Sequence, residues 1–180
     1  STKAAVAIQT TDSKIKQAVK KVGNITIGAI AKGAGMIHPN MATMLCFIAT
    51  DAKIPPSTLK NMLKTAVDQS FNMISVDFDT STSDMAIILA NGKKGNVNKT
   101  KFQAALNELC IDLAKEIASD GEGATKLLTV NVKKAKTDQQ AKSLAKTVIS
   151  SNLVKTAAYG NDPNWGRIIA ALGNAHVTID

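Results

Sequence analysis

The chain has 180 residues, of which 44% are hydrophobic and 3% aromatic, with a formal net charge of +8. This length suffices to bury a substantial core in one or two domains. Arg167 is the only Arg among the basic residues, whereas nucleic-acid readout and stacking favour Arg and aromatic rings. The charge therefore indicates solvated lysines or an acidic small-molecule substrate, and no nucleic-acid partner is expected.

Nothing in the sequence suggests a membrane segment. The longest apolar stretches are strand-sized, well below the roughly 20 residues of a membrane-spanning helix, and Ser1 opens no charged-then-apolar leader. We therefore expect no membrane partner and a cytoplasmic location, or an organellar matrix in a eukaryote. Cys46 and Cys110 lie in apolar stretches without Cys-x-x-Cys spacing, which is typical of structural thiols in a reducing compartment.

Short apolar runs bounded by turn residues predict the strands. They are residues 4–9, 25–30, 44–49, 73–78, 85–90, 127–132 and 177–179. Apolar residues at helical spacing predict helices from 55–57 to near Asn72, over 101–119 and 139–150, and through Ala171, with Ser57 as a helix cap. The type of the segment from Ile15 to Val22 stays open. The alternation of elements predicts an α/β or α+β layered fold.

Thr43 stands between a Gly- and Pro-rich loop, residues 32–40, and the apolar strand predicted over 44–49. A hydroxyl placed there could attack its own preceding carbonyl and break the Ala42–Thr43 bond. The freed α-amino group, with a reference pKa of roughly 7.7–8.0, would then serve as the base for the same hydroxyl. Thr is also common in strands, so spacing alone leaves both interpretations open.

Three other patterns are less specific. Residues 121–126, GEGATK, lack the spacing and the strand-to-helix order of a phosphate loop and are better explained as a helix end followed by a turn. Asp77, Asp79 and Asp84 could bind a hard cation, but their Ser and Thr neighbours favour a hydrogen-bonded corner. His38 beside Pro39 is assigned no catalytic role.

Residues 32–45, KGAGMIHPNMATML, closely resemble the self-cleavage signature of the glutamate N-acetyltransferase family, also called ornithine acetyltransferases. Similar family segments cover 10–12, 32–51, 75–84, 120–126 and 154–173. The departures are a short loop before Lys32, Ala34 where Ser is usual, and Phe78 and Ser83 where Gly and Asn are usual. These last two leave the shape of the corner around residues 77–84 open.

The resemblance implies the site. It makes Thr43 the nucleophile, exposed by cleavage between Ala42 and Thr43, and makes Thr10, Lys32, Thr43 and Glu122 substrate-binding residues. Spacing alone would describe Thr10 as a cap and Lys32 as a solvated loop charge. Neither a metal nor a cofactor is implied.

The resemblance also implies an αββα-type sandwich, of which this chain is a part. Residues 1–42 would end the N-terminal (α) segment and residues 43–180 would form the start and bulk of the C-terminal (β) segment, together one compact unit. Family members begin before Ser1 and continue past Asp180, and an upstream Thr-Gly pair forms their oxyanion hole. The expected partners are the remaining precursor segments, in a heterotetramer of two α and two β chains.

The implied function is an acyltransferase of arginine biosynthesis that moves an acetyl group from N-acetylornithine to glutamate through acetyl-Thr43. Whether acetyl-CoA is a second donor is left open. One alternative is an amidase or aminopeptidase on the same self-cleaving scaffold. The other is a lysine-rich binding domain without chemistry.

Overall fold

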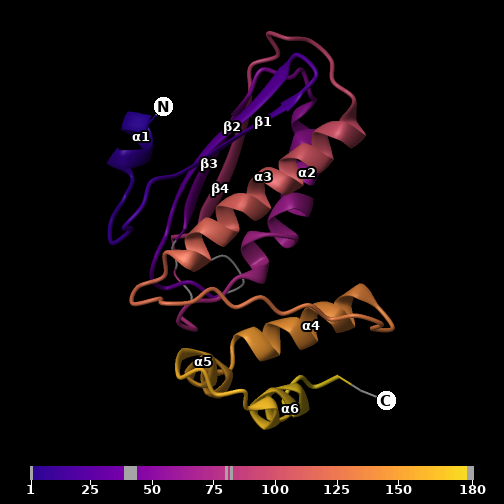
Figure 1. Ribbon diagram of the computed structural model, residues 1–180. Helices are drawn as coiled ribbons and strands as arrows, with labels where there is room; N and C mark the ends of the chain where they lie inside the picture. The colour runs from indigo at the N-terminus through magenta and orange to yellow at the C-terminus, as the bar shows by residue number, and fades with distance from the viewer. Residues whose placement is uncertain (1, 39–43, 80, 82, 178–180) are drawn as a thin grey trace. The chain divides into compact units, whose positions relative to one another are not determined.

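The computed structural model describes residues 2–38, 44–79, 81 and 83–177 (Figure 1). The chain folds as two compact units, Ser1–Glu122 and Gly123–Asp180. The expected cut between residues 42 and 43 lies outside the described residues and stays a prediction. Residues on both sides of it, such as Ile27 and Ile48, share the core of the first unit.

A four-stranded sheet forms the centre of the first unit. Its strands β1 (Lys16–Val22), β2 (Ile25–Lys32), β3 (Leu45–Thr50) and β4 (Met85–Ala90) lie in chain order. The first three pair antiparallel, and β4 joins β3 in parallel. A parallel neighbour requires a crossover, and helix α2 (Pro56–Asp68) with the short 3-10 helix η1 (Phe71–Met73) provides it.

The helix α3 (Lys99–Ser119) packs with α2 on one face of the sheet (Figure 1). Its inward stripe repeats at helical spacing and is fully buried, in the order Phe102, Leu106, Leu109, Leu113 and Ile117. Alternate residues of β2, from Ile25 to Ala31, face the same core. The short helix α1 (Thr2–Ala7) contacts β1 and β2.

The second unit contains three helices in its described part: α4 (Asp138–Ile149), α5 (Asn152–Tyr159) and α6 (Trp165–Gly173). Each begins with a side-chain cap, from Thr137, Ser151 and Asn164 respectively. Lys126 closes the other end of α5, because its ammonium donates to the carbonyls of Ala158 and Tyr159. The described residues contain no helix that could span a membrane.

The structure confirms the mixed α/β class, the predicted strands β2, β3 and β4 and the helices over 101–119, 139–150 and through Ala171. The open segment from Ile15 to Val22 is β1. Cys46 and Cys110 are free and buried, as expected of structural thiols, and burial raises the pKa of Cys110 to about 12. The helix from 55–57 ends at Asp68, earlier than expected.

Four predicted strands differ from the structure or lie partly outside the described residues. Residues 4–9 begin within helix α1, because an Ala-rich run has high helix propensity. Residues 73–78 form no strand. They bond instead to the Gly-rich loop that follows Lys32, where Val76 donates its N–H to the carbonyl of Ile37 at 2.7 Å. Residues 127–132 pair with no strand in the described part of the chain. Most of 177–179 lies outside the described residues.

Ser57 is not the cap of α2. The N-cap is Pro55, whose position carries no side-chain hydrogen bond, and Pro56 occupies the first turn. Proline suits this position because its missing N–H would have no partner there and its fixed φ is already helical.

The buried apolar stripe of α3 predicts how far shortening one core side chain lowers the free energy of unfolding. Leu109→Ala should lower the free energy of unfolding by about 2–5 kcal/mol, because Leu109 is fully buried and its methyl groups would leave a cavity. Leu89→Ala is the matched control, since Leu89 is 66% exposed, and it should stay within about 0.5 kcal/mol of the parent. Equilibrium urea unfolding measures both, and equal losses would contradict this packing.

Candidate functional site

Lys32 and Thr10 meet at the end of β2. Lys32 is the last residue of that strand and pairs with Leu45, the first residue of β3. The residue is only 7% exposed, and its ammonium donates to the Thr10 hydroxyl at 3.2 Å. Lys32 is therefore a nearly buried charge and not a solvated loop residue, and it lies beside another residue predicted to bind substrate.

Asp84 holds the start of β3. Its Oδ1 accepts the N–H of Met44 at 3.0 Å, and Met85 donates its N–H to the carbonyl of Met44 at 3.1 Å. Burial raises the pKa of the Asp84 carboxyl above its ordinary value, against the opposing effects of the Met44 N–H and the Lys32 charge. Its Oδ2 is buried and has no hydrogen-bond partner among the described atoms. Ala42 and Thr43 lie outside the described residues.

Glu122 lies against the glycine loop. Its N–H donates to the carbonyl of Ala34 at 2.8 Å, and its exposed carboxylate lies directly beside Gly35. A Cβ added to Gly35 would come within 2.7 Å of Glu122 Oε1, so only glycine permits this approach. The loop after α3 thus brings the predicted substrate-binding Glu122 to the segment that follows Lys32.

Asp77 fixes the same glycine loop from the other side. Its carboxylate accepts the N–H of Met36 at 2.6 Å and that of Ile37 at 2.9 Å. The His38 ring stacks on Phe78 with the centroids 4.6 Å apart, and its Nδ1 is 3.4 Å from the Ser75 hydroxyl. Asp77 and Asp84 both accept backbone N–H groups, as expected of residues in a hydrogen-bonded corner.

A buried ion cluster lies at the ends of the loops that carry Thr10 and Glu122. The Lys16 ammonium is 2.6 Å from Asp12 Oδ1 and 2.6 Å from Asp120 Oδ2, and Lys16 is 1% exposed. Sequence reasoning missed this cluster. The only signal was the i,i+4 spacing of Asp12 and Lys16, which indicates an ion pair on a helix but not across a loop and a strand.

Hydrogen bonds set the charge state of both carboxylates in the cluster. Burial alone would raise the pKa of Asp12, but the Gly33 N–H and the Lys16 ammonium outweigh it, so this pKa lies below its ordinary value. For Asp120, bonds from Lys16 and Ser13 likewise outweigh burial and lower the pKa. Both groups are therefore anions at neutral pH and form an ion pair with Lys16.

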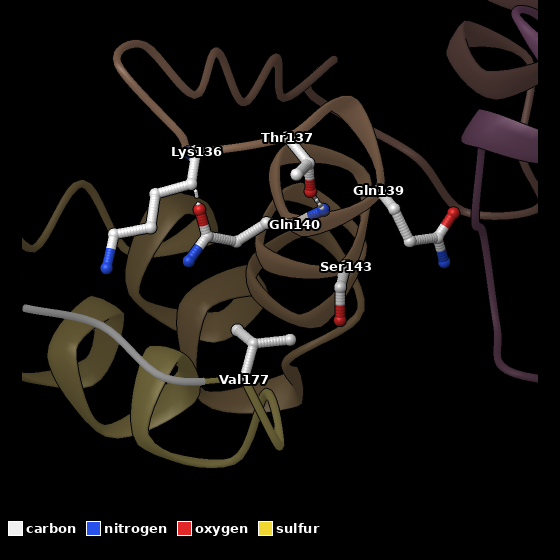
Figure 2. Close-up of a pocket in the computed structure, with 6 residues that line it drawn as sticks. All are labelled: Lys136, Thr137, Gln139, Gln140, Ser143 and Val177. Carbon is white, nitrogen blue, oxygen red and sulfur yellow. Dashed lines mark hydrogen bonds between the residues drawn. The ribbon is translucent and has the colours of Figure 1, made fainter.

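The second unit has a hollow of about 410 Å³ at the start of α4 (Figure 2). It is lined by Lys136, Thr137, Gln139, Gln140, Ser143 and Val177. Gln140 already accepts the Lys136 N–H and donates its own N–H to the Thr137 hydroxyl. None of the predicted site residues lines this hollow, and its polar groups mainly complete the first turn of α4.

The ion cluster predicts how acid affects stability. Because the pKa values of Asp12 and Asp120 fall below the ordinary 3.8, their stabilisation is full above that pH and is lost as the pH falls through the lowered values. Asp12→Asn should therefore show a shallower loss of unfolding free energy between pH 5 and pH 2. Urea unfolding at several pH values measures this slope.

Asp79→Asn is the matched control, because Asp79 is an exposed residue outside the cluster. It should keep the parent slope. A parent slope in Asp12→Asn would show that the cluster does not contribute to acid sensitivity.

Known proteins match this chain over nearly its full length. The model of the ArgJ family matches residues 1–180. The arginine biosynthesis bifunctional protein ArgJ 2 of Clostridium acetobutylicum is 54% identical over 169 residues, which cover 94% of this chain and 44% of that protein. ArgJ of Geobacillus stearothermophilus is 51% identical over 185 residues, 97% of this chain and 45% of that protein.

The crystal structure of the arginine biosynthesis bifunctional protein ArgJ from Bacillus halodurans is similar, with a TM-score of 0.72 and 45% identity over 74% of this chain and 66% of that one. The chain spans less than half the length of the two curated relatives. These matches confirm the resemblance drawn from residues 32–45, and the chain belongs to the ArgJ family.

Proposed function

We propose that this chain carries the nucleophile and part of the amino-acid site of an ornithine acetyltransferase, which moves an acetyl group from N-acetylornithine to glutamate. One observation carries the proposal: the Lys32 ammonium donates to the Thr10 hydroxyl, and Lys32 pairs with Leu45, the first residue of β3. Leu45 follows Thr43 by two residues in the sequence, so this pairing brings Lys32 and Thr10 to the start of the strand that follows Thr43. Membership of a family whose relatives are named arginine biosynthesis proteins supports the same pathway.

Self-cleavage is the first step of the proposed chemistry. The Thr43 hydroxyl oxygen attacks the Ala42 carbonyl carbon and the carbon–nitrogen bond breaks. The nitrogen keeps its own hydrogen and takes up the proton that the hydroxyl loses, so it leaves as the new α-amine while an ester joins Ala42 to the Thr43 oxygen. Water then hydrolyses the ester, which leaves a carboxylate at Ala42 and a free hydroxyl at Thr43. The α-amine lies within reach of that hydroxyl and can accept its proton.

Acetyl transfer would follow in two exchanges at the same oxygen. Thr43 attacks the acetyl carbonyl of N-acetylornithine, and ornithine leaves with the proton taken by the amine. The amine of glutamate then attacks acetyl-Thr43, and the threonine oxygen regains its proton. Two exchanges at one nucleophile avoid binding both amino acids at once. An oxyanion hole would come from the upstream Thr-Gly pair implied by the family resemblance.

The charges of the candidate site complement an amino acid. Lys32 presents an ammonium that suits a substrate carboxylate, and Glu122 presents an exposed carboxylate that suits a substrate ammonium. Charge-assisted hydrogen bonds of this type contribute typically ~1.5–3 kcal/mol each. Opposite charges at the end of β2 and in the loop after α3 would also orient the substrate along one direction.

We extend the proposal to the assembly. Cleavage would place residues 1–42 in an α chain and residues 43–180 in a β chain, with other precursor segments completing a heterotetramer of two α and two β chains. Acetyl-CoA as a second donor fits the same nucleophile, because a thioester carbonyl accepts the same attack.

Self-cleavage gives the first test. The full-length protein that contains this segment should split at Ala42–Thr43 without added protease, and Thr43→Ala should remain one chain because it lacks the attacking oxygen. Intact-mass spectrometry in native buffer distinguishes the two states. Thr100→Ala, at the exposed start of α3, is the control and should split normally. Splitting of Thr43→Ala would remove Thr43 as the nucleophile.

Gly35 gives a test of the substrate site. Gly35→Ala should push the Glu122 carboxylate from its place, so kcat/KM for N-acetylornithine should fall about tenfold or more, as expected for the loss of one charge-assisted bond. Self-cleavage should survive. Steady-state kinetics with and without glutamate measure the effect, and release of acetate without glutamate would indicate a hydrolase instead.

Gly28→Ala is the matched control, since a Cβ there meets nothing within 4 Å. It should leave kcat/KM unchanged. Unchanged kinetics in Gly35→Ala as well would mean that Glu122 is only a turn residue.

A further inference from the structure

The cluster of Asp12, Lys16 and Asp120 has no part in the proposed chemistry, yet it is almost fully buried. The exposed fractions are 1% for the Lys16 side chain, 0% for Asp12 and 3% for Asp120. Removing three charges from water is costly, and an apolar residue in place of a buried ion pair is often as stable or more so. Stability alone therefore gives a weak reason for a lysine at this position.

The cluster is bonded to the backbone of the loops that carry the candidate site. Asp12 Oδ1 accepts the N–H of Gly33 at 2.6 Å, the residue directly after Lys32. Its Oδ2 accepts the N–H of Thr10 at 3.2 Å. One carboxylate thus fixes the backbone at or beside two of the residues predicted to bind substrate.

Asp120 makes the corresponding connection for the third loop. Its Oδ2 accepts the N–H groups of Ser13 and Lys14 at 3.0 and 3.3 Å, and the Ser13 hydroxyl donates to its Oδ1. Two residues later, Glu122 donates its own N–H to the carbonyl of Ala34. Residues 10–16, 32–35 and 120–122 are therefore joined through one network, and Lys16 is the cation shared by its two carboxylates.

We propose that Lys16 is a positioning residue of the amino-acid site: by pairing with Asp12 and Asp120 it holds Thr10, Lys32 and Glu122 in one fixed arrangement. The inference rests on the proposed function for its substrate and on the described contacts for its geometry. Without the ammonium, two buried carboxylates face each other and repel, so the loops separate and the three side chains lose their common alignment.

Lys16→Met tests this role, because methionine keeps an unbranched side chain but no charge. In the complete, self-cleaved enzyme we expect KM for N-acetylornithine and for glutamate to rise at least tenfold, with kcat changed less than threefold. Amide hydrogen exchange is the second readout. Exchange at Gly33, Thr10 and Glu122 should accelerate at least tenfold, while Met85, whose N–H bonds to Met44 away from the cluster, should keep its rate.

Lys20→Met is the matched control. Lys20 lies on the same strand and pairs with Asp112 at 2.9 Å and Glu108 at 3.5 Å, but these carboxylates are half-exposed or more and bind none of the site loops. Both KM values and all three exchange rates should match the parent. A parental result in Lys16→Met overturns the proposal, and so does a uniform acceleration at Gly33 and Met85, which would indicate general destabilisation.

Asp12→Asn is a second variant in case Lys16→Met does not fold. It keeps the side-chain shape and the pair between Lys16 and Asp120 but weakens the bond to Gly33, so exchange should accelerate at Gly33 and Thr10 and less at Glu122. Equal rates at Gly33 in parent and variant would overturn the proposal. Absence of turnover in the parent enzyme would refute the proposed function, whereas hydrogen exchange would still decide whether Lys16 holds the loops.

Discussion

The packing of α3 against β1 and β2 is the interaction on which the rest of the first unit depends. The fully buried stripe from Phe102 to Ile117 fixes both the position and the direction of this helix. Because α3 ends at Ser119, the same packing delivers Asp120 and Glu122 to the neighbourhood of residues 12–16 and 33–35. The apolar core thus determines which charged residues meet outside it.

In the loops near the end of β2 and the start of β3, aspartate carboxylates accept backbone N–H groups that a neighbouring strand would accept within a sheet. Backbone N–H groups there have no ladder partner, and an unpaired buried N–H is costly. Asp12, Asp77, Asp84 and Asp120 each accept at least one such group. Because an ionised carboxylate accepts several bonds at once, a few aspartates can fix these loops without regular secondary structure. Asp12 and Asp120 hold the backbone around residues 10–14 and 33, and Asp77 and Asp84 hold residues 36–37 and 44.

The sequence predicts the elements that form the core and misses the contacts that depend on a distant partner. Strands β2 to β4 and helix α3 follow from their hydrophobic patterns. Residues 73–78 alternate apolar and polar side chains as a strand would, but their neighbours in space decide their conformation. Family resemblance points to the predicted substrate-binding residues through short sequence motifs.

Lys16 was missed because periodicity treats a lysine as solvent-exposed, while its burial depends on Asp120, 104 residues away. The backbone bonds of Asp12 and Asp84 have no signature either, because such aspartates look in the sequence like any other turn residue.

Phe78 shows how the corner tolerates a departure from the family pattern. Its φ is +74°, in the region that favours glycine and costs other residues roughly 1–2 kcal/mol, which gives a physical reason for the glycine usual at this position. Stacking on the His38 ring offsets part of that cost, since such ring pairs contribute about 0.5–1.5 kcal/mol. The preceding Asp77 still accepts the N–H groups of Met36 and Ile37. The substitution therefore changes the surface of the corner while the bonds that anchor the glycine loop remain in place.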